Sequence, residues 1–387
     1  MSSSEQNDRT AGPQLAVIGG GVIGLTSALA AADAGWQVTV YDAGPQFRAS
    51  SVAGGMLGFL GEGHPGEEAL LAVSERSVAR WPALINRLGD ETVMTARDSI
   101  FLATSAADAA YLKQIAEFVW ACRPRTADQL TPVGAREIRS LERGLGARVR
   151  SGYVARDEGS VDNRRLLAAL ERALERSGVV ICRSRVSDPS SIAADQVLLA
   201  PGAGMADLGG FAPITLAKGE VLRLRADRWC VPPPRHVIRA RVDGRTVYLV
   251  PRADGIVVGA SQYEGDLDEW RSGAPTPRAG EVADLLADAI EVFPGLRDYT
   301  LTEVSVGFRP CSPDGLPIIS RIDERTVMAV GHGRNGIVLA PYTADQVVEL
   351  LSGTVDDGVY VSSVSPADYQ SVNDPAVVRP AVRGEVR

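Results

Sequence analysis

A glycine cluster near the N-terminus has the spacing of a phosphate-binding turn. Gly19, Gly21 and Gly24 follow the apolar run LAVI and precede an alanine-rich segment. Gly19 permits a tight turn, Gly21 lets the backbone approach a pyrophosphate, and Gly24 lets a helix pack closely on the preceding strand. Free amides at the start of that helix, at Val22 and Ile23, would face the phosphate charge. The succession of strand, glycines and helix predicts a dinucleotide-binding unit.

An acidic residue stands where such a unit contacts ribose. Asp42 ends the next apolar run, WQVTVYD. A carboxylate there can accept hydrogen bonds from a ribose hydroxyl pair. Nicotinamide enzymes and flavoproteins share this arrangement, so it predicts a dinucleotide without identifying which one.

Two further segments of small residues could lie against the same cofactor. Residues 49–57 read ASSVAGGML, and residues 198–204 read LLAPGAG at the end of a predicted strand. Glycine-rich backbone can approach a flat ring or a pyrophosphate closely. A flexible loop would also explain residues 49–57.

Two arginines are candidates for binding an anion. Arg309 ends the apolar run TEVSVGF, so a rigid strand would direct it inward. A guanidinium binds a carboxylate through two parallel hydrogen bonds, although a structural ion pair is the alternative for Arg309. Arg334 stands among Gly331, Gly333 and Gly336 at the start of a predicted helix. It could face a ligand or be a solvated residue at the helix start.

The hydrophobic periodicity predicts an α/β fold interrupted by an antiparallel sheet. The segment up to Asp42 has the pattern strand, helix, strand, which begins a parallel sheet. Between 215 and 262 the pattern changes to short alternating strands, with turns predicted at Asp243–Gly244 and Asp254–Gly255. Helices are predicted at 67–88, at 163–177 between a cap at Asp162 and a stop at Gly178, at 277–292 and at 335–351.

Composition and charge exclude several classes of protein. The 387 residues are 45% hydrophobic, enough for one large core or two medium ones, and the net charge is −8. A nucleic-acid partner would need a basic surface. The widely spaced cysteines and unclustered histidines predict neither a metal site nor a disulfide framework. The polar start lacks a signal peptide and glycines interrupt the uncharged stretch 15–32, so a cytoplasmic protein outside the membrane is predicted.

Seven segments occur in the order typical of one group of flavoproteins. Together they resemble the D-amino-acid-oxidase-type flavoproteins and, within them, are similar to the glycine oxidases of thiamine biosynthesis (the ThiO type). The resemblance spans about 15–353; its last three segments are specific to the group, whereas the glycine turn is shared with many flavoproteins. The segments are the glycine turn, SSVAGGML, DEGSVDNRRL (157–166), LAPGAG, VYLVPRADGIVVGAS (247–261), GFRPCSPDGLPII (307–319) and GHGRNGIVLAP (331–341).

The resemblance implies non-covalent FAD and a small set of substrate-binding residues. Arg309 would hold the substrate carboxylate, Tyr248 would lie beside it, and Arg334 would line the far side of the pocket. The implied FAD contacts are Gly19, Gly21, Val22, Ile23, Gly24, Asp42, Ser50, Ser51, Ala53, Gly54, Gly55, Met56, Val186, Pro201, Gly202, Gly333, Arg334, Asn335, Gly336 and Ile337.

The order of the predicted elements, together with the resemblance, predicts the organisation of the chain. A Rossmann-like FAD-binding domain would be interrupted by a mixed α+β substrate domain built on the antiparallel sheet. The predicted FAD-binding domain comprises 14–90, 145–215 and 305–365, the substrate domain comprises 91–144 and 216–304, and 1–13 and 366–387 are predicted to be a disordered and a flexible tail.

The implied reaction is oxidation of glycine, or a similar small amino acid, by O₂. Hydride would pass from the α-carbon to flavin N5, and the imine would hydrolyse or pass to thiazole synthase. Because the cofactor carries the difficult step, the protein's tasks are orientation and charge stabilisation. The helix from 335 would direct its amides at the charge of the reduced flavin. His64 and His236 are expected at the surface and His332 beside the cofactor, with no proton transfer assigned to it. A homo-oligomer is expected by family analogy.

The sequence is also compatible with other substrates and other functions. The substrate could instead be sarcosine, proline or a small D-amino acid, and Gly58, Phe59 and Gln262 near the motifs could alter the pocket. A dehydrogenase would pass its electrons to a carrier in place of O₂. A non-catalytic FAD-binding or NAD-binding module is the alternative outside enzymes, but it gives no reason for Arg309 and Tyr248 to lie beside the cofactor.

Overall fold

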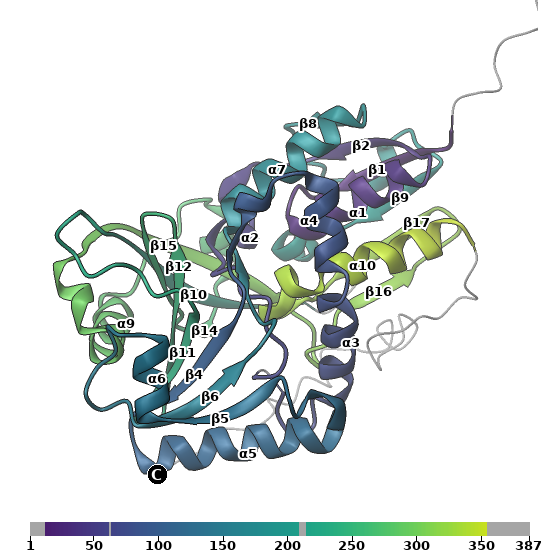
Figure 1. The fold of residues 1–387 in the computed structure, drawn as a ribbon. Coiled ribbons are helices and arrows are strands. Elements are labelled where there is room, and N and C mark those ends of the chain that lie inside the picture. The colour runs from purple at the N-terminus through teal and green to yellow at the C-terminus, as the bar shows by residue number, and fades with distance from the viewer. Residues whose placement is uncertain (1–11, 62, 209–213, 354–387) are drawn as a thin grey trace, which may run out of the picture.

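Two large β-sheets form the body of the molecule. The computed structural model describes residues 12–61, 63–208 and 214–353. In Figure 1 a six-stranded sheet lies at the upper right and a nine-stranded sheet at the lower left. The predicted α/β class with an antiparallel sheet is confirmed. The predicted tails, 1–13 and 366–387, lie outside the described residues apart from residues 12 and 13.

The six-stranded sheet is parallel except at one edge, where one strand runs antiparallel to its neighbour. Along the first strand Leu15 and Val17 enter one core, and Ala16 and Ile18 enter another on the opposite face. Burial of both faces explains why these strands are almost wholly apolar. In spatial order the strands are β16 (Ile318–Arg321), β17 (Thr326–Val330), β9 (Gln196–Leu199), β1 (Gln14–Ile18), β2 (Gln37–Tyr41) and β8 (Val180–Cys182).

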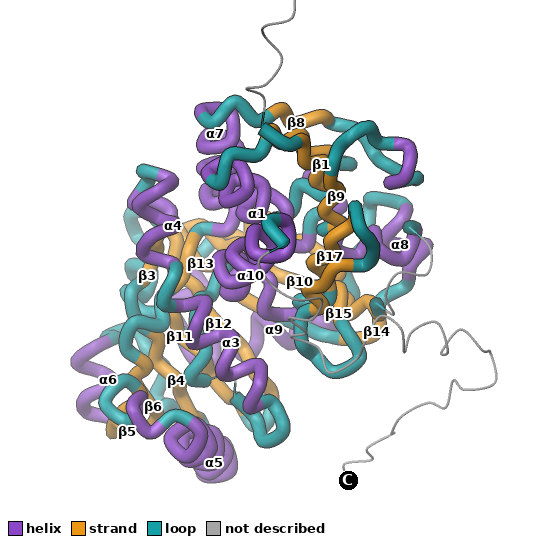
Figure 2. Tube along the Cα trace, turned by 90° about the vertical axis from the view of Figure 1, so that its right-hand side faces the viewer, coloured by secondary structure: helices purple, strands orange, loops and turns teal. Residues whose placement is uncertain are grey.

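Helices cover one face of this sheet. Figure 2 shows α1 (Val22–Asp33) and α10 (Gly336–Leu351) on the same side of the row formed by β1, β9 and β17. The first helix contacts both α10 and α7 (Asn163–Arg176), which accounts for its small, uncharged side chains. The predicted ends of α7 are confirmed, because the Asp162 carboxylate accepts from two amides of its first turn and Gly178 has a φ of 76°. No helix in the described part of the chain combines the length and the apolar character needed to cross a membrane.

The predicted helix at 67–88 is wrong, because the segment forms two helices. α3 (Glu68–Val78) ends before α4 (Trp81–Leu88) begins. Pro82 explains the break, since a proline lacks an amide hydrogen and its ring clashes with the carbonyl four residues earlier. That carbonyl belongs to Val78, the last residue of α3. Both helices still bury their apolar faces in the core of the first sheet.

The nine-stranded sheet is mostly antiparallel. One face packs against α9 (Ala279–Val292) through Leu285 and Ala289, and the opposite face carries Tyr248. β15 pairs with β10 beside the main path. The strands are β14 (Tyr263–Glu264), β10 (Thr215–Arg225), β13 (Gly255–Gly259), β12 (Arg245–Arg252), β11 (Val237–Val242), β4 (Ser99–Ala103), β6 (Ser151–Ala155), β5 (Leu130–Gly134) and β15 (Thr300–Cys311).

One of the two predicted hairpin turns is displaced. Asp243 and Gly244 join β11 to β12 with φ values of 47° and 88°, as a two-residue turn requires. Between β12 and β13, however, Arg252 pairs with Gly255, so the turn lies one residue earlier than predicted. Gly255 is already part of the strand, where a Cβ atom would lie 2.0 Å from a carbonyl oxygen of β10.

The domain boundaries remain a prediction. Two strands assigned wholly or partly to the FAD-binding domain pair within the nine-stranded sheet. β6 lies within 145–215, the segment assigned to the FAD-binding domain, yet it pairs with β4 and β5 of the nine-stranded sheet. β15 extends beyond residue 305 and pairs with β10 along its length. The remaining elements are α2 (Ala49–Val52), α5 (Ala106–Cys122), α6 (Ala135–Leu141), α8 (Leu267–Arg271) and the pair β3 (Met94–Ala96) and β7 (Ser160–Val161).

Candidate active site

A cavity of about 660 Å³ receives residues from both sheets. It lies beyond the carboxyl ends of β1, β2 and β9, where ligands bind in folds of this kind. All the residues predicted for the site line this cavity except Gly24 and Ser51. The Ser51 carbonyl instead accepts a hydrogen bond from Arg164, 3.2 Å from Nε.

The three glycines of the turn differ in backbone conformation and in the space around them. Gly19 has a φ of 122°, and a Cβ atom there would lie 2.1 Å from the Ala200 carbonyl oxygen. A Cβ atom at Gly24 would lie 1.9 Å from the Gly19 carbonyl oxygen, so Gly24 serves close packing of the helix on the turn. Gly21 differs, because its nearest neighbour would be Ser50 Oγ at 3.6 Å. The start of α1 is therefore accessible from the cavity at Gly21.

Asp42 lies at the cavity between two arginines. Its Oδ2 is 2.7 Å from Arg48 Nη2 and also accepts from Arg183. Burial raises the pKa of the Asp42 carboxyl, but the hydrogen bonds and charge of the arginines bring that pKa below its ordinary value. Asp42 is therefore ionised at neutral pH. Asp42 was predicted from the sequence, but its two arginine partners were not, because their spacing from Asp42 follows no recognisable pattern.

The segment 50–60 forms one wall of the cavity, and residues 158–163 hold it in place. The Asn163 side chain donates from Nδ2 to the Ser50 carbonyl at 2.7 Å. Backbone bonds join Val161 N to the Gly55 carbonyl at 2.7 Å and Leu57 N to the Gly159 carbonyl at 3.0 Å. These contacts join two of the family-like segments, although the sequence did not show that the later one supports the earlier one.

Two buried charged residues complete this support. The Glu158 carboxylate, which is fully buried, accepts from the amides of Phe59 and Leu60. Arg252 donates from Nη2 to the Gly54 carbonyl at 2.9 Å. Burial lowers the pKa of Arg252 to about 10, so its guanidinium stays charged at neutral pH. Neither role was predicted, although Glu158 and Arg252 both lie in segments of the family-like pattern.

Tyr248 faces the cavity from β12. Cβ atoms at Gly54 and Gly259 would lie 2.8 Å from Tyr248 Cε2 and 2.3 Å from its hydroxyl, so the ring passes between two glycines. Burial raises the pKa of the Tyr248 hydroxyl, and the charge of Arg309 opposes that rise. No protein partner bonds this hydroxyl within the described ranges, which leaves it able to donate to a ligand.

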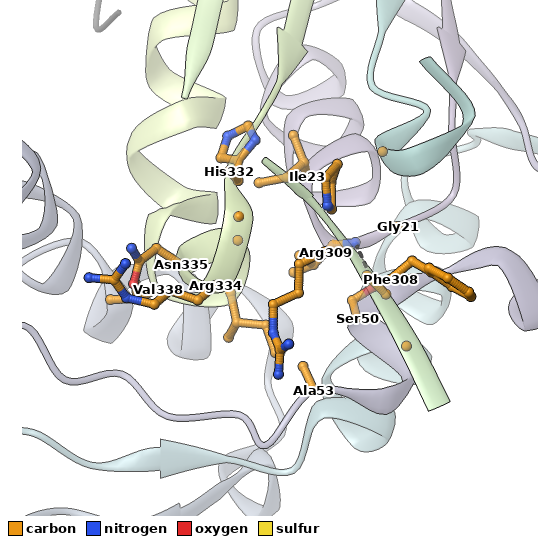
Figure 3. Close-up of a pocket in the computed structure, with 18 of the residues that line it drawn as sticks. Gly21, Ile23, Ser50, Ala53, Phe308, Arg309, His332, Arg334, Asn335 and Val338 are labelled. Atoms are coloured by element: carbon orange, nitrogen blue, oxygen red, sulfur yellow. Dashed lines mark hydrogen bonds between the residues drawn. The ribbon is translucent and has the colours of Figure 1, made fainter. Parts of the chain in front are cut away.

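Arg309 extends into the same cavity from β15, and Figure 3 shows its side chain running toward Ala53. The guanidinium donates from Nη1 to the Ser261 carbonyl at 3.3 Å. Among the residues that the structure describes, it has no carboxylate partner. A half-buried guanidinium without a counter-ion is suited to binding an anionic ligand. The predicted alternative, a structural ion pair, is absent from the described residues.

The family described as FAD dependent oxidoreductase (DAO) matches residues 14–350. The chain belongs to this family. Its members depend on FAD, so the predicted cofactor is confirmed for this oxidoreductase.

Individual relatives extend this result. A bifunctional protein ThiO/ThiG of Synechocystis is 30% identical over 385 residues, which are 94% of this chain but 55% of that protein. The chain therefore spans about half the length of the relatives of this bifunctional type. A glycine oxidase of Pseudomonas putida is 30% identical, over 88% of this chain and 94% of that protein. The crystal structure of glycine oxidase from Geobacillus kaustophilus matches with a TM-score of 0.77 and 26% identity, covering 90% and 96% of the two chains.

The residues of this oxidoreductase fit FAD at several points. Gly21 leaves space for a phosphate at the start of α1, and Asp42 offers an ionised carboxylate for a ribose. At the other side of the cavity Gly331 and Gly333 have φ values of 75° and 53°, just before α10 begins. Such conformations favour glycine, and a Cβ atom at Gly333 would have Cys311 Sγ as its nearest neighbour, at 3.7 Å, so the backbone there is accessible from the cavity.

Arg334 is placed differently from Arg309. Its Nη2 lies 3.1 and 3.0 Å from the two carboxylate oxygens of Glu67, and its side chain is 38% exposed. Arg334 lines the cavity from the short 3₁₀ turn Gly333–Asn335 (Figure 3). A catalytic role for Arg334 therefore remains a prediction, and its carboxylate partner distinguishes it from Arg309.

The three histidines differ in their exposure. His332 lies beside the cavity and is 4% exposed, with Nε2 2.9 Å from Thr343 Oγ1. Burial lowers the pKa of His332 to about 3, so the ring is neutral at physiological pH. His64 and His236, which were expected at the surface, are both partly exposed. His64 is half-buried at the cavity wall, and His236 is half-buried with Nδ1 2.7 Å from Glu142.

Proposed function

We propose that this oxidoreductase is a glycine oxidase, which oxidises glycine to its imine with O₂ as the electron acceptor. The observation that carries the proposal is the guanidinium of Arg309, which faces the cavity beside Tyr248 with no counter-ion in the described chain. The substrate of such an enzyme is a small amino acid with a carboxylate. The similarity to glycine oxidases supports glycine as that amino acid.

The protein's part in the reaction is to bind and orient the substrate. Arg309 would hold the carboxylate through two parallel hydrogen bonds, and Tyr248, which stays protonated, would donate a third. Bound FAD would supply the acceptor for the hydride that leaves the α-carbon. The substrate loses two electrons and two protons in forming the imine, and O₂ takes up both as hydrogen peroxide. Water then converts the imine to the oxo acid and ammonia.

The cofactor contacts belong to the same proposal. We infer that FAD is held without a covalent bond by the glycine turn, Asp42, the segment 50–56, Val186, the segment 201–202 and residues 333–337, with Arg334 adding positive charge at the rim. The six-stranded sheet would carry the cofactor, and the nine-stranded sheet would form the substrate wall. Residues from both sheets line the same cavity, which supports this arrangement.

The product, cellular location and assembly state are further parts of the proposal. Relatives named ThiO/ThiG support thiazole synthase as a partner that takes the imine before it hydrolyses. The acidic net charge and widely spaced cysteines support a cytoplasmic protein. We expect a homo-oligomer, which light scattering of the purified protein would test.

A second candidate is an oxidase or dehydrogenase of a larger substrate, such as sarcosine, proline or a D-amino acid. The cavity lining also includes the largely apolar side chains of Phe101, Leu112 and Tyr153. A substrate with an additional alkyl group would have apolar surface to contact there.

One experiment separates these candidates. The purified protein should be yellow, lose its colour with glycine under nitrogen and regain it in air with release of peroxide. Bleaching by sarcosine, proline or D-alanine in place of glycine would select the second candidate. Bleaching without recovery in air would indicate a dehydrogenase. A protein that is colourless and does not take up added FAD would contradict the proposal.

A further inference from the structure

A buried carboxylate lies behind the proposed substrate anchor. Glu220 is 0% exposed and belongs to β10, the strand that pairs with β15 and places Ala217 opposite Arg309. Successive strand residues point to opposite faces, and Gly219 and Val221 line the cavity. Glu220 therefore projects from the far face of the sheet, away from the ligand.

Glu220 and Ser261 hold each other through two hydrogen bonds. The Glu220 amide donates to Ser261 Oγ at 2.8 Å, and the same hydroxyl donates to the Glu220 carboxylate. The carboxylate also accepts from the Tyr263 hydroxyl at 2.5 Å and from the Arg278 amide at 3.0 Å. Burial raises the pKa of Glu220, but these hydrogen bonds bring that pKa below its ordinary value, so the acceptor is ionised at neutral pH. Ser261 is thus fixed on a charged acceptor.

The same serine meets Arg309 through its backbone. The Ser261 carbonyl accepts from Arg309 Nη1 at 3.3 Å, and this is the guanidinium's protein hydrogen bond within the described ranges. Gly219 lies against both groups, since a Cβ atom there would be 2.2 Å from the Ser261 oxygen and 2.7 Å from Arg309 Nη1. The absence of a side chain at Gly219 therefore leaves room for the guanidinium beside its acceptor.

We propose that Glu220 and Ser261 are positioning residues for Arg309, acting through the Ser261 carbonyl. Glu220 fixes the serine from the far face of the sheet, and the serine carbonyl fixes one side of the guanidinium. The remaining N–H groups of Arg309 then face the cavity in one orientation. The inference rests on the proposed binding of a substrate carboxylate by Arg309. Glu220, on the far face of the sheet, would then affect the affinity for substrate without contacting it. The inference assigns Glu220 and Ser261 no contact with substrate or cofactor.

The test compares Ser261→Ala with Ser261→Thr, which retains the hydroxyl, and with Glu220→Gln. Tyr263→Phe is the matched control, because it removes a hydrogen bond from the same carboxylate without touching Ser261. The readouts are KM and kcat for glycine, FAD content from the visible spectrum, melting temperature, and Kd for acetate from the change that acetate produces in the flavin spectrum. Acetate probes the carboxylate site without turnover.

We expect Ser261→Ala and Glu220→Gln to raise KM for glycine and Kd for acetate by about five- to tenfold, with kcat and FAD content close to the wild type. Ser261→Thr should restore both values, and Tyr263→Phe should lower the melting temperature without changing them. In an Arg309→Met background, Ser261→Ala should have no further effect on acetate binding, because the group through which it acts is gone.

Unchanged acetate affinity in folded, yellow Ser261→Ala protein would overturn the positioning role. So would an equal loss of affinity in Tyr263→Phe, since that result would indicate general loosening of the sheet. If glycine and the other amino acids fail to reduce the wild-type flavin while acetate still binds, the proposed function fails and the acetate comparison still decides this inference. Absence of acetate binding to the wild-type protein would contradict both.

Discussion

The two walls of the cavity are held in contrasting ways. The segment 50–60 is bonded along its length to residues 158–163 and to Arg252, through both backbone and buried side chains. The Arg309 guanidinium, which reaches the cavity from β15, has one protein hydrogen bond among the described residues. The protein thus completes the wall predicted for the cofactor with its own contacts, and it leaves the proposed substrate anchor incomplete until a ligand arrives.

The contrast extends to the two arginines of the site. Arg334 has a carboxylate partner, Glu67, whereas Arg309 has none in the described chain. A guanidinium whose charge is already matched gains little from a second carboxylate, while an unmatched, half-buried one gains more. Position at the cavity alone does not distinguish them, so the counter-ion decides which arginine we expect to bind substrate.

The largest effect is expected on the cofactor wall, from Gly21→Val. The added side chain would occupy the space through which a phosphate approaches the start of α1, so the purified protein should lack FAD and be colourless. Gly280→Val is the control, because a Cβ atom at Gly280 meets nothing within 4 Å, and Gly280 does not line the cavity. Full FAD occupancy in Gly21→Val would refute the phosphate-binding role.

Arg309→Met should have the next largest effect, and only on the substrate side. Loss of a charge-assisted, two-bond contact should raise KM for glycine about 100-fold or more, while FAD stays bound. Steady-state kinetics together with the visible spectrum check both parts. Arg309→Lys should recover a small part of the loss, since a lysine keeps the charge but not the paired geometry. A KM equal to that of the wild type would remove Arg309 as the anchor.

A smaller effect is expected when the support of the cofactor wall is weakened. Asn163→Ala removes the bond to the Ser50 carbonyl and the acceptor of Arg223, so Kd for FAD should rise about tenfold and the melting temperature should fall. Titration of the apoprotein with FAD measures the first change. Arg165→Ala, at a neighbouring exposed residue, is the control and should leave Kd for FAD unchanged. Equal values in the two variants would mean that the wall needs no such support.

The smallest effect is expected at Arg334. Because Arg334 is paired with Glu67, Arg334→Met should change KM for glycine by no more than about threefold, as should Glu67→Gln. The ratio of the KM values of Arg334→Met and Arg309→Met tests whether the arginine without a carboxylate partner contributes more to substrate binding. A loss at Arg334 as large as that at Arg309 would show that the two arginines act together on the substrate.

Local patterns predicted the cofactor turn well and the supporting contacts poorly. The turn at 19–24 and the cap at Asp162 depend on neighbours in the sequence, so residue type and spacing reveal them. The bonds of Glu158 to Phe59 and Leu60 join residues about a hundred positions apart, and no spacing rule marks them. For Pro82 the signal was available, since a proline inside a predicted helix indicates a break, and apolar periodicity outweighed it.

The resemblance predicted which segments meet at the site, but not how each cation is neutralised. Arg309 and Arg334 look equivalent in the sequence, because each lies beside a glycine or a proline at the boundary of a predicted element. Their difference depends on whether a carboxylate from a distant segment reaches them, and Glu67 does so from the start of α3. The same holds for Glu220, whose burial and partners follow from the pairing of β10 with β15 and not from its neighbours in the chain.

The burial of α1 between the sheet, α7 and α10 has a consequence for the cofactor-free protein. Amides in a helix enclosed on most sides exchange with solvent only through large opening events. Deuterium uptake at residues 23–32 should therefore be slow with or without FAD, whereas residues 331–336 should become protected on binding. The phosphate-binding turn would then be a preformed platform on which the apoprotein receives its flavin.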